Sequence, residues 1–206
     1  AVIQSNAQLF GMLVNSEKEV LLEKYEEVTT RITSQISKMT DLMDEVLILG
    51  KITSGNVRYA PEYFDLLECG RQLVDQFNSI QKDGRVLVCE TEGEPQEVYL
   101  DPKLLIHSLS NLVSNAFKYS QGKPSPRLKV VFESNSFSLL VSDHGIGIPK
   151  QEIEHLTEPF FRAYNAMEIE GTGLGLSIVD EYVQINKGEL IMSSQEEVGS
   201  TFQIKF

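Results

Sequence analysis

The sequence predicts an α+β fold in two regions, and three observations support this prediction. Roughly the first fifty residues carry apolar side chains at helical spacing, with almost no strand signal. Beyond Pro61, short strand-like runs alternate with helical segments, which is typical of helices that cover one face of a mainly antiparallel sheet. Between the two regions, Gly50 and Gly55 mark a change of pattern. We therefore expect one domain over residues 1–55 and a second over residues 62–206.

The first region is expected to form a helical hairpin. Its second helix begins near Ser16, which is followed three residues later by Glu19 in a capping-box pattern. A hairpin of this size cannot bury two apolar faces, so we expect two copies to pair into a four-helix bundle and form a homodimer. The alternative is that the hairpin packs on the rest of its own chain. The heptad seam consists of Tyr25, Val28, Ile32, Gln35, Met39, Leu42, Val46 and Leu49, widened by Ile36 and Met43.

The second region has mixed periodicity. The pair Asp101-Pro102 is a helix start, because Asp is a good N-cap and proline fits the first helical position. Gly188 is expected to end the last helix. Strands are expected near residues 63–66, 86–90, 97–100, 128–133, 137–142, 189–193 and 201–206, and helices over 67–80, from 101 onward, and over 173–186.

Composition and charge exclude several classes of function. The formal net charge of −12 argues against binding to nucleic acid or to anionic membranes, since both need basic patches. No run of 18 apolar residues and no signal-peptide pattern occurs. Cys69 and Cys89 lie in apolar stretches and are expected to be buried free thiols in a reducing compartment. We therefore expect a cytoplasmic protein, or the cytoplasmic part of one that could be membrane-anchored.

Three polar residues share one face of the helix that starts at Asp101. Asn111, Asn115 and Lys118 are spaced four and three residues apart. Mg²⁺ prefers oxygen ligands and keeps several waters, so one or two amide oxygens suffice where phosphates supply the rest. Lys118 would neutralise phosphate charge. The alternative for this face, taken alone, is a solvated polar surface.

A second element, Asp143-His144-Gly145-Ile146-Gly147-Ile148-Pro149, follows an apolar strand. A carboxylate at Asp143 can accept a hydrogen bond from an exocyclic amino group, which favours adenine over guanine. Gly145 and Gly147 would let the backbone approach the base closely. The alternative is an ordinary strand ending in an Asp-containing turn, in which His144 is a turn residue.

The third element is the run Gly171-Thr172-Gly173-Leu174-Gly175-Leu176, which opens a helix. Backbone N–H groups at a helix N-terminus can hold phosphate oxygens. No Lys-Ser/Thr pair follows the last glycine, so the run is not a P-loop. The segment 158–170 before it lacks periodicity and could be a lid anchored by the Phe160-Phe161 pair, with Arg162 near a terminal phosphate. The alternative is a surface loop.

With these elements in this order, the chain resembles the sensor histidine kinases of bacterial two-component systems. Residues 111–119 resemble the N box of that family, 143–147 the G1 box, 158–162 the F box and 171–176 the G2 box. The resemblance implies a Bergerat-type ATP-binding domain that uses ATP and Mg²⁺, after a dimerisation hairpin. It implies that Asn115 coordinates Mg²⁺, that Asp143 binds adenine, and that Asn111, Lys118 and Arg162 serve catalysis. The further nucleotide contacts that it implies are Tyr119, Gly145, Gly147, Ile148, Thr172, Gly173, Leu174, Gly175 and Leu176.

The chain departs from the family at the phosphoacceptor. Its histidines are His107, His144 and His155, and none stands in the H-box context of the family. We therefore expect a kinase that transfers the γ-phosphoryl of ATP to a histidine upstream of residue 1, for relay to a response-regulator aspartate, with the regulator docking on the hairpin.

Two other classes of function remain as alternatives. The gyrase-like and chaperone-like ATPases of the same superfamily carry a Glu four residues before the metal-binding Asn. Here that position is Asn111, and an amide cannot act as a general base. The other class is a dimerising module with a vestigial nucleotide domain, which the four intact boxes oppose. Phosphate labelling of a histidine separates the kinase from both.

Overall fold

The computed structural model describes residues 18–206, and the chain divides into two compact units, residues 1–50 and 51–206. The first helix of the expected hairpin and its Ser16 cap lie outside the described residues. In the part of the chain that the structure describes, no helix combines the length and apolar character needed to cross a bilayer. Each unit is described by itself.

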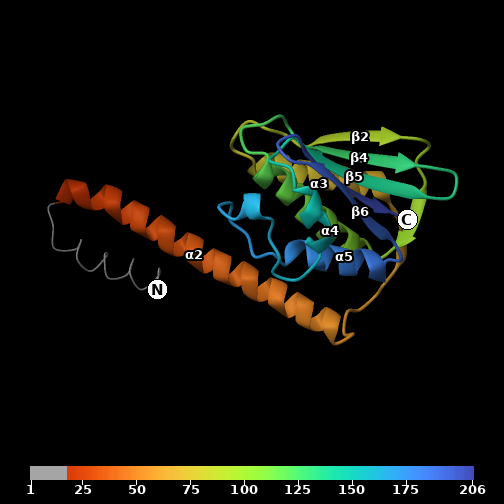
Figure 1. The fold of residues 1–206 in the computed structure, drawn as a ribbon, viewed down its shortest axis with the longest axis horizontal. Helices are drawn as coiled ribbons and strands as arrows, with labels where there is room; N and C mark the ends of the chain where they lie inside the picture. Colours follow the sequence, from red (N-terminus) through yellow and green to blue (C-terminus); the bar gives the residue numbers. More distant parts are fainter. Residues whose placement is uncertain (1–17) are drawn as a thin grey trace. The chain divides into compact units, whose positions relative to one another are not determined.

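The first unit contains most of the helix α2, Lys18–Thr53 (Figure 1). Its C-terminus is closed by a Schellman motif, in which Gly55 adopts a φ of +67°. The N–H of Gly55 donates to the carbonyl of Ile52 over 2.9 Å, and the N–H of Asn56 donates to that of Lys51 over 2.8 Å. The helix exposes a set of large apolar side chains, which are Ile36, Met39, Leu42, Met43, Val46 and Leu47.

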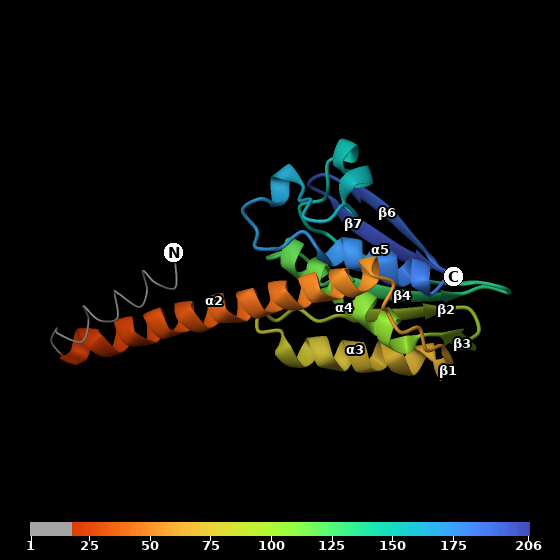
Figure 2. The same ribbon diagram turned by 90° about the horizontal axis from the view of Figure 1, so that it is seen from below.

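The second unit is built on a five-stranded sheet with the order β2-β4-β5-β7-β6. Only the β2–β4 pair is parallel, and three helices lie together on one face of the sheet (Figures 1 and 2). A separate antiparallel pair is formed by β1 and β3. This arrangement confirms the predicted α+β class. The bounds are β1 Glu62–Asp65, α3 Leu66–Ile80, β2 Val88–Glu92, β3 Glu97–Leu100, α4 Pro102–Tyr119, β4 Arg127–Phe132, β5 Phe137–Asp143, α5 Gly175–Ile185, β6 Glu189–Gln195 and β7 Gly199–Lys205.

The core lies between the sheet and α4. On this helix Leu109, Leu112 and Val113 have no exposed surface. They pack with fully buried strand residues such as Leu139 and Val141. Burying one such side chain contributes about 1.5–3 kcal/mol, so the apolar side of α4 fixes the helix on the sheet and leaves its polar side for another use.

Asp101, only 2% exposed, joins three parts of the second unit. Its Oδ1 accepts from the backbone N–H groups of Lys103 and Leu104 at 2.9 and 3.3 Å, which caps α4 as the sequence predicts. Its Oδ2 accepts from the backbone N–H of Ala60 at 2.8 Å. Its backbone N–H donates to Oδ1 of Asn186, whose Nδ2 returns a bond to the Asp101 carbonyl, at 2.8 and 3.2 Å. The incoming chain, the start of α4 and the end of α5 therefore meet at one residue.

Two sequence predictions are wrong in detail. Leu66 belongs to α3 rather than to a strand, because the side chain of Asp65 caps that helix through the N–H groups of Leu67 and Glu68. Cys89 is exposed, because β2 is an edge strand. Cys69 is buried as expected, and desolvation raises the pKa of its thiol to about 11.

Candidate nucleotide-binding site

The polar face of α4 carries the predicted metal and phosphate residues. Asn111, Asn115 and Lys118 are all partly exposed, while the neighbouring Leu112 and Ala116 are buried. Nδ2 of Asn115 donates to Oδ1 of Asn111 over 3.0 Å. Because its nitrogen is engaged in this way, the amide of Asn115 is oriented and can present its oxygen to a ligand.

The glycine run meets this face of α4. A Cβ on Gly175 would lie 2.5 Å from Nδ2 of Asn111, so only glycine allows the start of α5 to approach the amide so closely. A Cβ on Gly171 would lie 3.2 Å from Nζ of Lys118 and 3.6 Å from the hydroxyl of Tyr119. The structure thus brings the N-box and G2-box residues together, at a helix N-terminus suited to phosphate oxygens.

Within the same loop, Leu174 is fully buried and Thr172 turns the backbone. Oγ1 of Thr172 accepts from the N–H of Leu174 at 3.2 Å. Gly173 has a φ of +78°, and its carbonyl accepts from the N–H of Phe160 at 2.9 Å. The loop is therefore tied to the F-box segment through the backbone. Leu176, at the first turn of α5, packs against the core.

Asp143 ends β5 with only 8% of its surface exposed. Its Oδ1 accepts from the N–H of Gly145 at 2.7 Å, which fixes the plane of the carboxylate. Burial raises the pKa of this carboxyl, and hydrogen bonds from the backbones of Gly145 and Ser200 partly oppose that rise. A carboxylate kept where its charge is disfavoured is a candidate for ligand recognition.

The loop after Asp143 is fixed to three other elements. The N–H of Ile146 donates to the carbonyl of Tyr119 over 3.1 Å, at the end of α4. The carbonyl of Gly147 accepts from Nδ2 of Asn165 at 3.0 Å, and the N–H of Ile148 donates to Oγ of Ser194 over 2.8 Å. Asn165 is not found by sequence analysis, since a lone amide in a segment without periodicity gives no signal.

Gly147 is expected to tolerate no side chain. Its φ is +64°, and a Cβ would lie 2.0 Å from the carbonyl oxygen of Gln195. Gly147→Ala should destabilise the second unit by about 2–4 kcal/mol through strain and overlap, and lower its unfolding temperature by roughly 5–15 °C. The control is Gly122→Ala, where φ is +72° but nothing lies within 4 Å, so only the backbone cost applies. Equal shifts for both variants in thermal unfolding would contradict the close approach at Gly147.

The F-box residues are placed differently from the sequence expectation. The ring of Phe160 is 62% exposed, so this residue anchors the glycine loop with its backbone rather than its side chain. The guanidinium of Arg162 donates to the carbonyls of Ala166 and Ile169 within the segment 158–170. Its Nε lies about 4.0 Å from the position of a Cβ on Gly171. Arg162 therefore braces the segment 158–170 beside the glycine loop, and both a lid function of this segment and a contact of Arg162 with a terminal phosphate stay predictions.

The arrangement fits a nucleotide with its metal better than a metal alone. Among residues 18–206 no group of three or more His, Cys, Asp or Glu side chains could hold a metal ion. The available donors are amide oxygens on α4, which suit Mg²⁺ when phosphates complete its coordination. The glycine loop supplies N–H groups for those phosphates, and the Asp143 carboxylate supplies an acceptor for an amino group.

Comparison with known proteins identifies the family of the domain in which these residues lie. The family model described as histidine kinase-, DNA gyrase B-, and HSP90-like ATPase matches residues 100–206, more than half of the chain. The sensor histidine kinase YkoH of Bacillus subtilis is 31% identical over 207 residues, which cover 100% of this chain and 44% of YkoH. The sensor histidine kinase WalK of the same species is 28% identical over 172 residues, covering 82% of this chain and 28% of WalK.

Solved structures agree on the fold. The histidine kinase AdeS of Acinetobacter baumannii superposes with a TM-score of 0.73 and 24% identity, over 100% of this chain and 92% of that one. The chain spans less than half the length of the two curated relatives, 44% and 28%. From the matched domain, the chain belongs to the histidine kinase-, DNA gyrase B- and HSP90-like ATPase family, and within that family it is similar to sensor histidine kinases.

Proposed function

We propose that this chain binds Mg-ATP and serves as the catalytic core of a protein-histidine kinase. The proposal rests on one observation, which is that the hydrogen-bonded amides of Asn111 and Asn115 lie close to the glycine loop at Gly175. This junction supports the proposal, because amide oxygens of a kind that can bind Mg²⁺ lie beside backbone N–H groups of a kind that can bind phosphates. Phosphoryl transfer depends mainly on positioning and charge neutralisation, which these groups supply.

Each predicted residue has a role in the proposal. Asn115 gives its amide oxygen to Mg²⁺, and Asn111 orients that amide. Lys118 and Arg162 neutralise phosphate charge. To do so, Arg162 exchanges its hydrogen bonds to the carbonyls of Ala166 and Ile169 for bonds to a phosphate. Asp143 accepts from the amino group of adenine. The backbone of Gly145, Gly147 and Ile148 lies along the base, while Tyr119 and residues 172–176 surround the phosphates and ribose.

We further propose that the phosphoacceptor is a histidine upstream of residue 1. Two of the three histidines of this chain, His107 and His155, have other contacts in the second unit. The ring of His107 packs edge-on against Tyr182, with 5.2 Å between ring centroids. Nδ1 of His155 lies 2.7 Å from Glu158, and this pairing raises the pKa of the imidazole. In the proposed reaction an imidazole nitrogen of the acceptor attacks the γ-phosphorus, the bond to the β–γ bridging oxygen breaks, and ADP leaves. A response-regulator aspartate then takes the phosphoryl group.

The test is phosphate labelling with [γ-³²P]ATP and Mg²⁺. It is carried out on this chain and on a form extended at its N-terminus by a segment that contains the proposed phosphoacceptor histidine. Acid-labile, base-stable label on the extended form alone is expected. Label on the short form would place the acceptor among its own histidines. Bound ATP with no label on either form would favour an ATPase or a vestigial module.

We also propose that α2 forms the homodimer through its exposed apolar face. Met39 is 57% exposed in a single chain, in the middle of this face. Met39→Asp should raise the dissociation constant of the dimer by at least about 100-fold, because each copy would bury an unpaired charge. Ser37→Asp, two residues away on the opposite side of the helix, is the matched control. Light scattering at micromolar concentration should report a monomer for Met39→Asp only, and an unchanged mass would refute the bundle.

A further inference from the structure

The C-terminal end of α4 needs partners from outside the helix. The last carbonyls of any helix lack intrahelical donors. Here the cap residue Ser120 has φ −114° and ψ 30°, and its Oγ donates back to the carbonyl of Ala116 over 2.6 Å. Lys118 and Tyr119, the residues closest to the Gly171 position, lie in this last turn. Their placement therefore depends on what holds the end of the helix.

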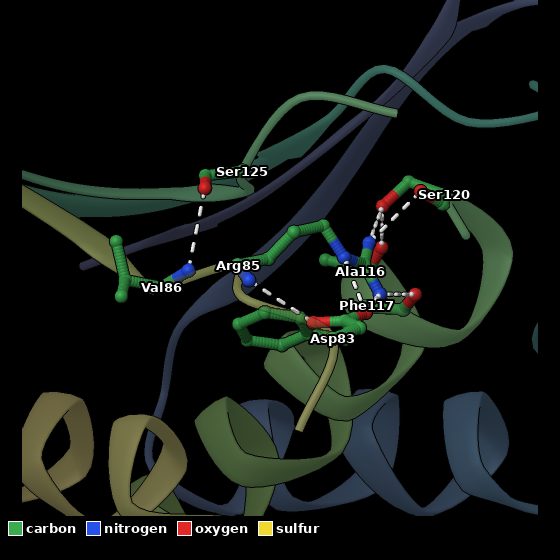
Figure 3. Close-up of polar contacts among 7 residues, drawn as sticks. All are labelled: Asp83, Arg85, Val86, Ala116, Phe117, Ser120 and Ser125. Carbon is green, nitrogen blue, oxygen red and sulfur yellow. Dashed lines mark hydrogen bonds and ion pairs between the residues drawn. The ribbon is translucent and has the colours of Figure 1, made fainter. Parts of the chain in front are cut away.

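One guanidinium holds that end (Figure 3). Nη1 of Arg85 donates to the carbonyl and to Oγ of Ser120, over 2.8 and 2.9 Å. Nη2 donates to the carbonyl of Phe117 over 3.0 Å. A positive charge at this terminus also complements the negative end of the helix dipole. Arg85 lies in the connection between α3 and β2, more than thirty positions before its partners in the sequence.

Arg85 is itself held in place. Its side chain is only 12% exposed, and its Nε and Nη2 lie 2.7 and 2.6 Å from Oδ2 of Asp83. Its guanidinium carbon lies 5.1 Å from the ring centroid of Phe117, which stacks on Phe77 at 6.0 Å. The next residue, Val86, is bound to Oγ of Ser125 through its backbone N–H at 3.3 Å (Figure 3). These contacts hold the guanidinium of Arg85 in the orientation from which it donates to the end of α4.

The bonds of Arg85 bracket the two residues that face the phosphate loop. Phe117 precedes Lys118, and Ser120 follows Tyr119. Nζ of Lys118 also lies 4.5 Å from the centroid of the Tyr119 ring, so the two side chains form one unit. We propose that Arg85 is a positioning residue for the phosphates of ATP, which acts by fixing Lys118 and Tyr119 and touches no ligand itself. This inference rests on the proposed function of the site.

The adenine side of the site is held by the sheet as well as by the bond from the N–H of Ile146 to the carbonyl of Tyr119. Asp143 ends β5, which pairs with β4 on one side and β7 on the other. Asp143 itself is paired with Ser200. Arg85 contacts none of these strand residues through the hydrogen bonds of its side chain. Loss of Arg85 should therefore weaken the binding of phosphates more than the binding of the nucleoside.

The experiment compares Arg85→Met and Arg85→Lys with the wild-type chain. Met keeps the length of the side chain and removes every donor, whereas Lys keeps the charge but cannot bridge two carbonyls as a fork does. The control is Arg71→Met, which removes an exposed guanidinium paired with Glu68 on α3. Affinities for ATP with Mg²⁺ and for adenosine are measured by calorimetry, at a temperature where thermal unfolding shows each variant to be folded.

Arg85→Met is expected to lower the affinity for ATP by at least about tenfold, and that for adenosine by less than about threefold. Arg85→Lys should also lose affinity for ATP, since the charge alone does not position the last turn of α4. Arg71→Met should bind ATP as the wild type does. Unchanged ATP affinity in folded Arg85→Met, or equal losses for both ligands, would overturn the proposal. Should Arg85→Met not fold, wild-type ATP affinity in Arg85→Lys would overturn it. A wild-type chain that does not bind ATP would overturn the proposed function as well.

Discussion

Asp143→Asn should lower the affinity of this chain for ATP by about 100-fold or more while leaving its fold intact. The amide keeps an oxygen for the N–H of Gly145 but directs its –NH₂ group toward the amino group of adenine, where two donors oppose each other. The amide can instead donate to the O6 of guanine. The ratio of ATP to GTP affinity should therefore fall as well.

Although Asp143→Asn should weaken ATP binding, it should not destabilise the protein in the absence of ligand. Burial raises the pKa of Asp143 in the fold. The stabilising contribution of this carboxyl is therefore fully present below its unfolded pKa of about 3.9, and it is lost as the pH rises through the folded value. At neutral pH, Asp143→Asn should be at least as stable as the wild type. As the pH falls toward 4, the wild type should gain stability relative to the variant.

Two measurements check this prediction. Calorimetric titration with ATP and with GTP at pH 7 gives the specificity, and thermal unfolding without ligand from pH 4 to 8 gives the stability. If the affinity for ATP is unchanged in Asp143→Asn, then Asp143 does not bind adenine. A loss of ATP affinity that is accompanied by a large drop in unfolding temperature at pH 7 would instead mark Asp143 as a structural residue.

Asn115→Ala should remove most of the Mg²⁺-dependent part of ATP binding. The substitution deletes the amide that Asn111 orients over 3.0 Å. The expected loss is about 10- to 100-fold in the presence of Mg²⁺, as for a hydrogen-bonded or ligating contact to a charged group. Binding in excess EDTA should change little, since the phosphate loop and Asp143 remain.

The matched control is the adjacent Ser114→Ala, on the exposed side of α4. It changes helix propensity and surface polarity in a similar way without touching the amide pair. Titrations with and without Mg²⁺ on both variants isolate the metal contribution. An Asn115→Ala protein that loses the same affinity with and without Mg²⁺ would show that Asn115 acts on the nucleotide rather than on the metal.

Local rules explain which parts of the fold could be predicted from the sequence. The start of α4 follows from Asp101-Pro102, because a cap and a proline act on the residues next to them. The polar face of that helix follows from the spacing of Asn111, Asn115 and Lys118. The same local rules wrongly predicted that Cys89 is buried. Apolar neighbours in the sequence do not indicate whether a strand pairs with one strand of the sheet or with two.

The supports of the site could not be predicted, because they depend on contacts made in space. Arg85 bonds to Phe117 and Ser120, which are 32 and 35 positions away in the sequence, so no local pattern marks these contacts. Asn165 reaches the carbonyl of Gly147 across 18 positions, and nothing in its own segment marks it. A sequence motif contains the residues that contact a ligand. The residues that hold the motif in place can lie in any loop that packs against it in the fold.

The bond between Ala60 and Asp101 shortens the free connection between α2 and β1. The Schellman motif holds the chain to α2 as far as Asn56, and the Asp101 carboxylate holds it again at Ala60. Only Val57–Tyr59 lie between these two points, and a stretch of this length spans at most about 15 Å when fully extended. These two anchors therefore leave the connection between α2 and β1 little length over which the distance between its ends can change.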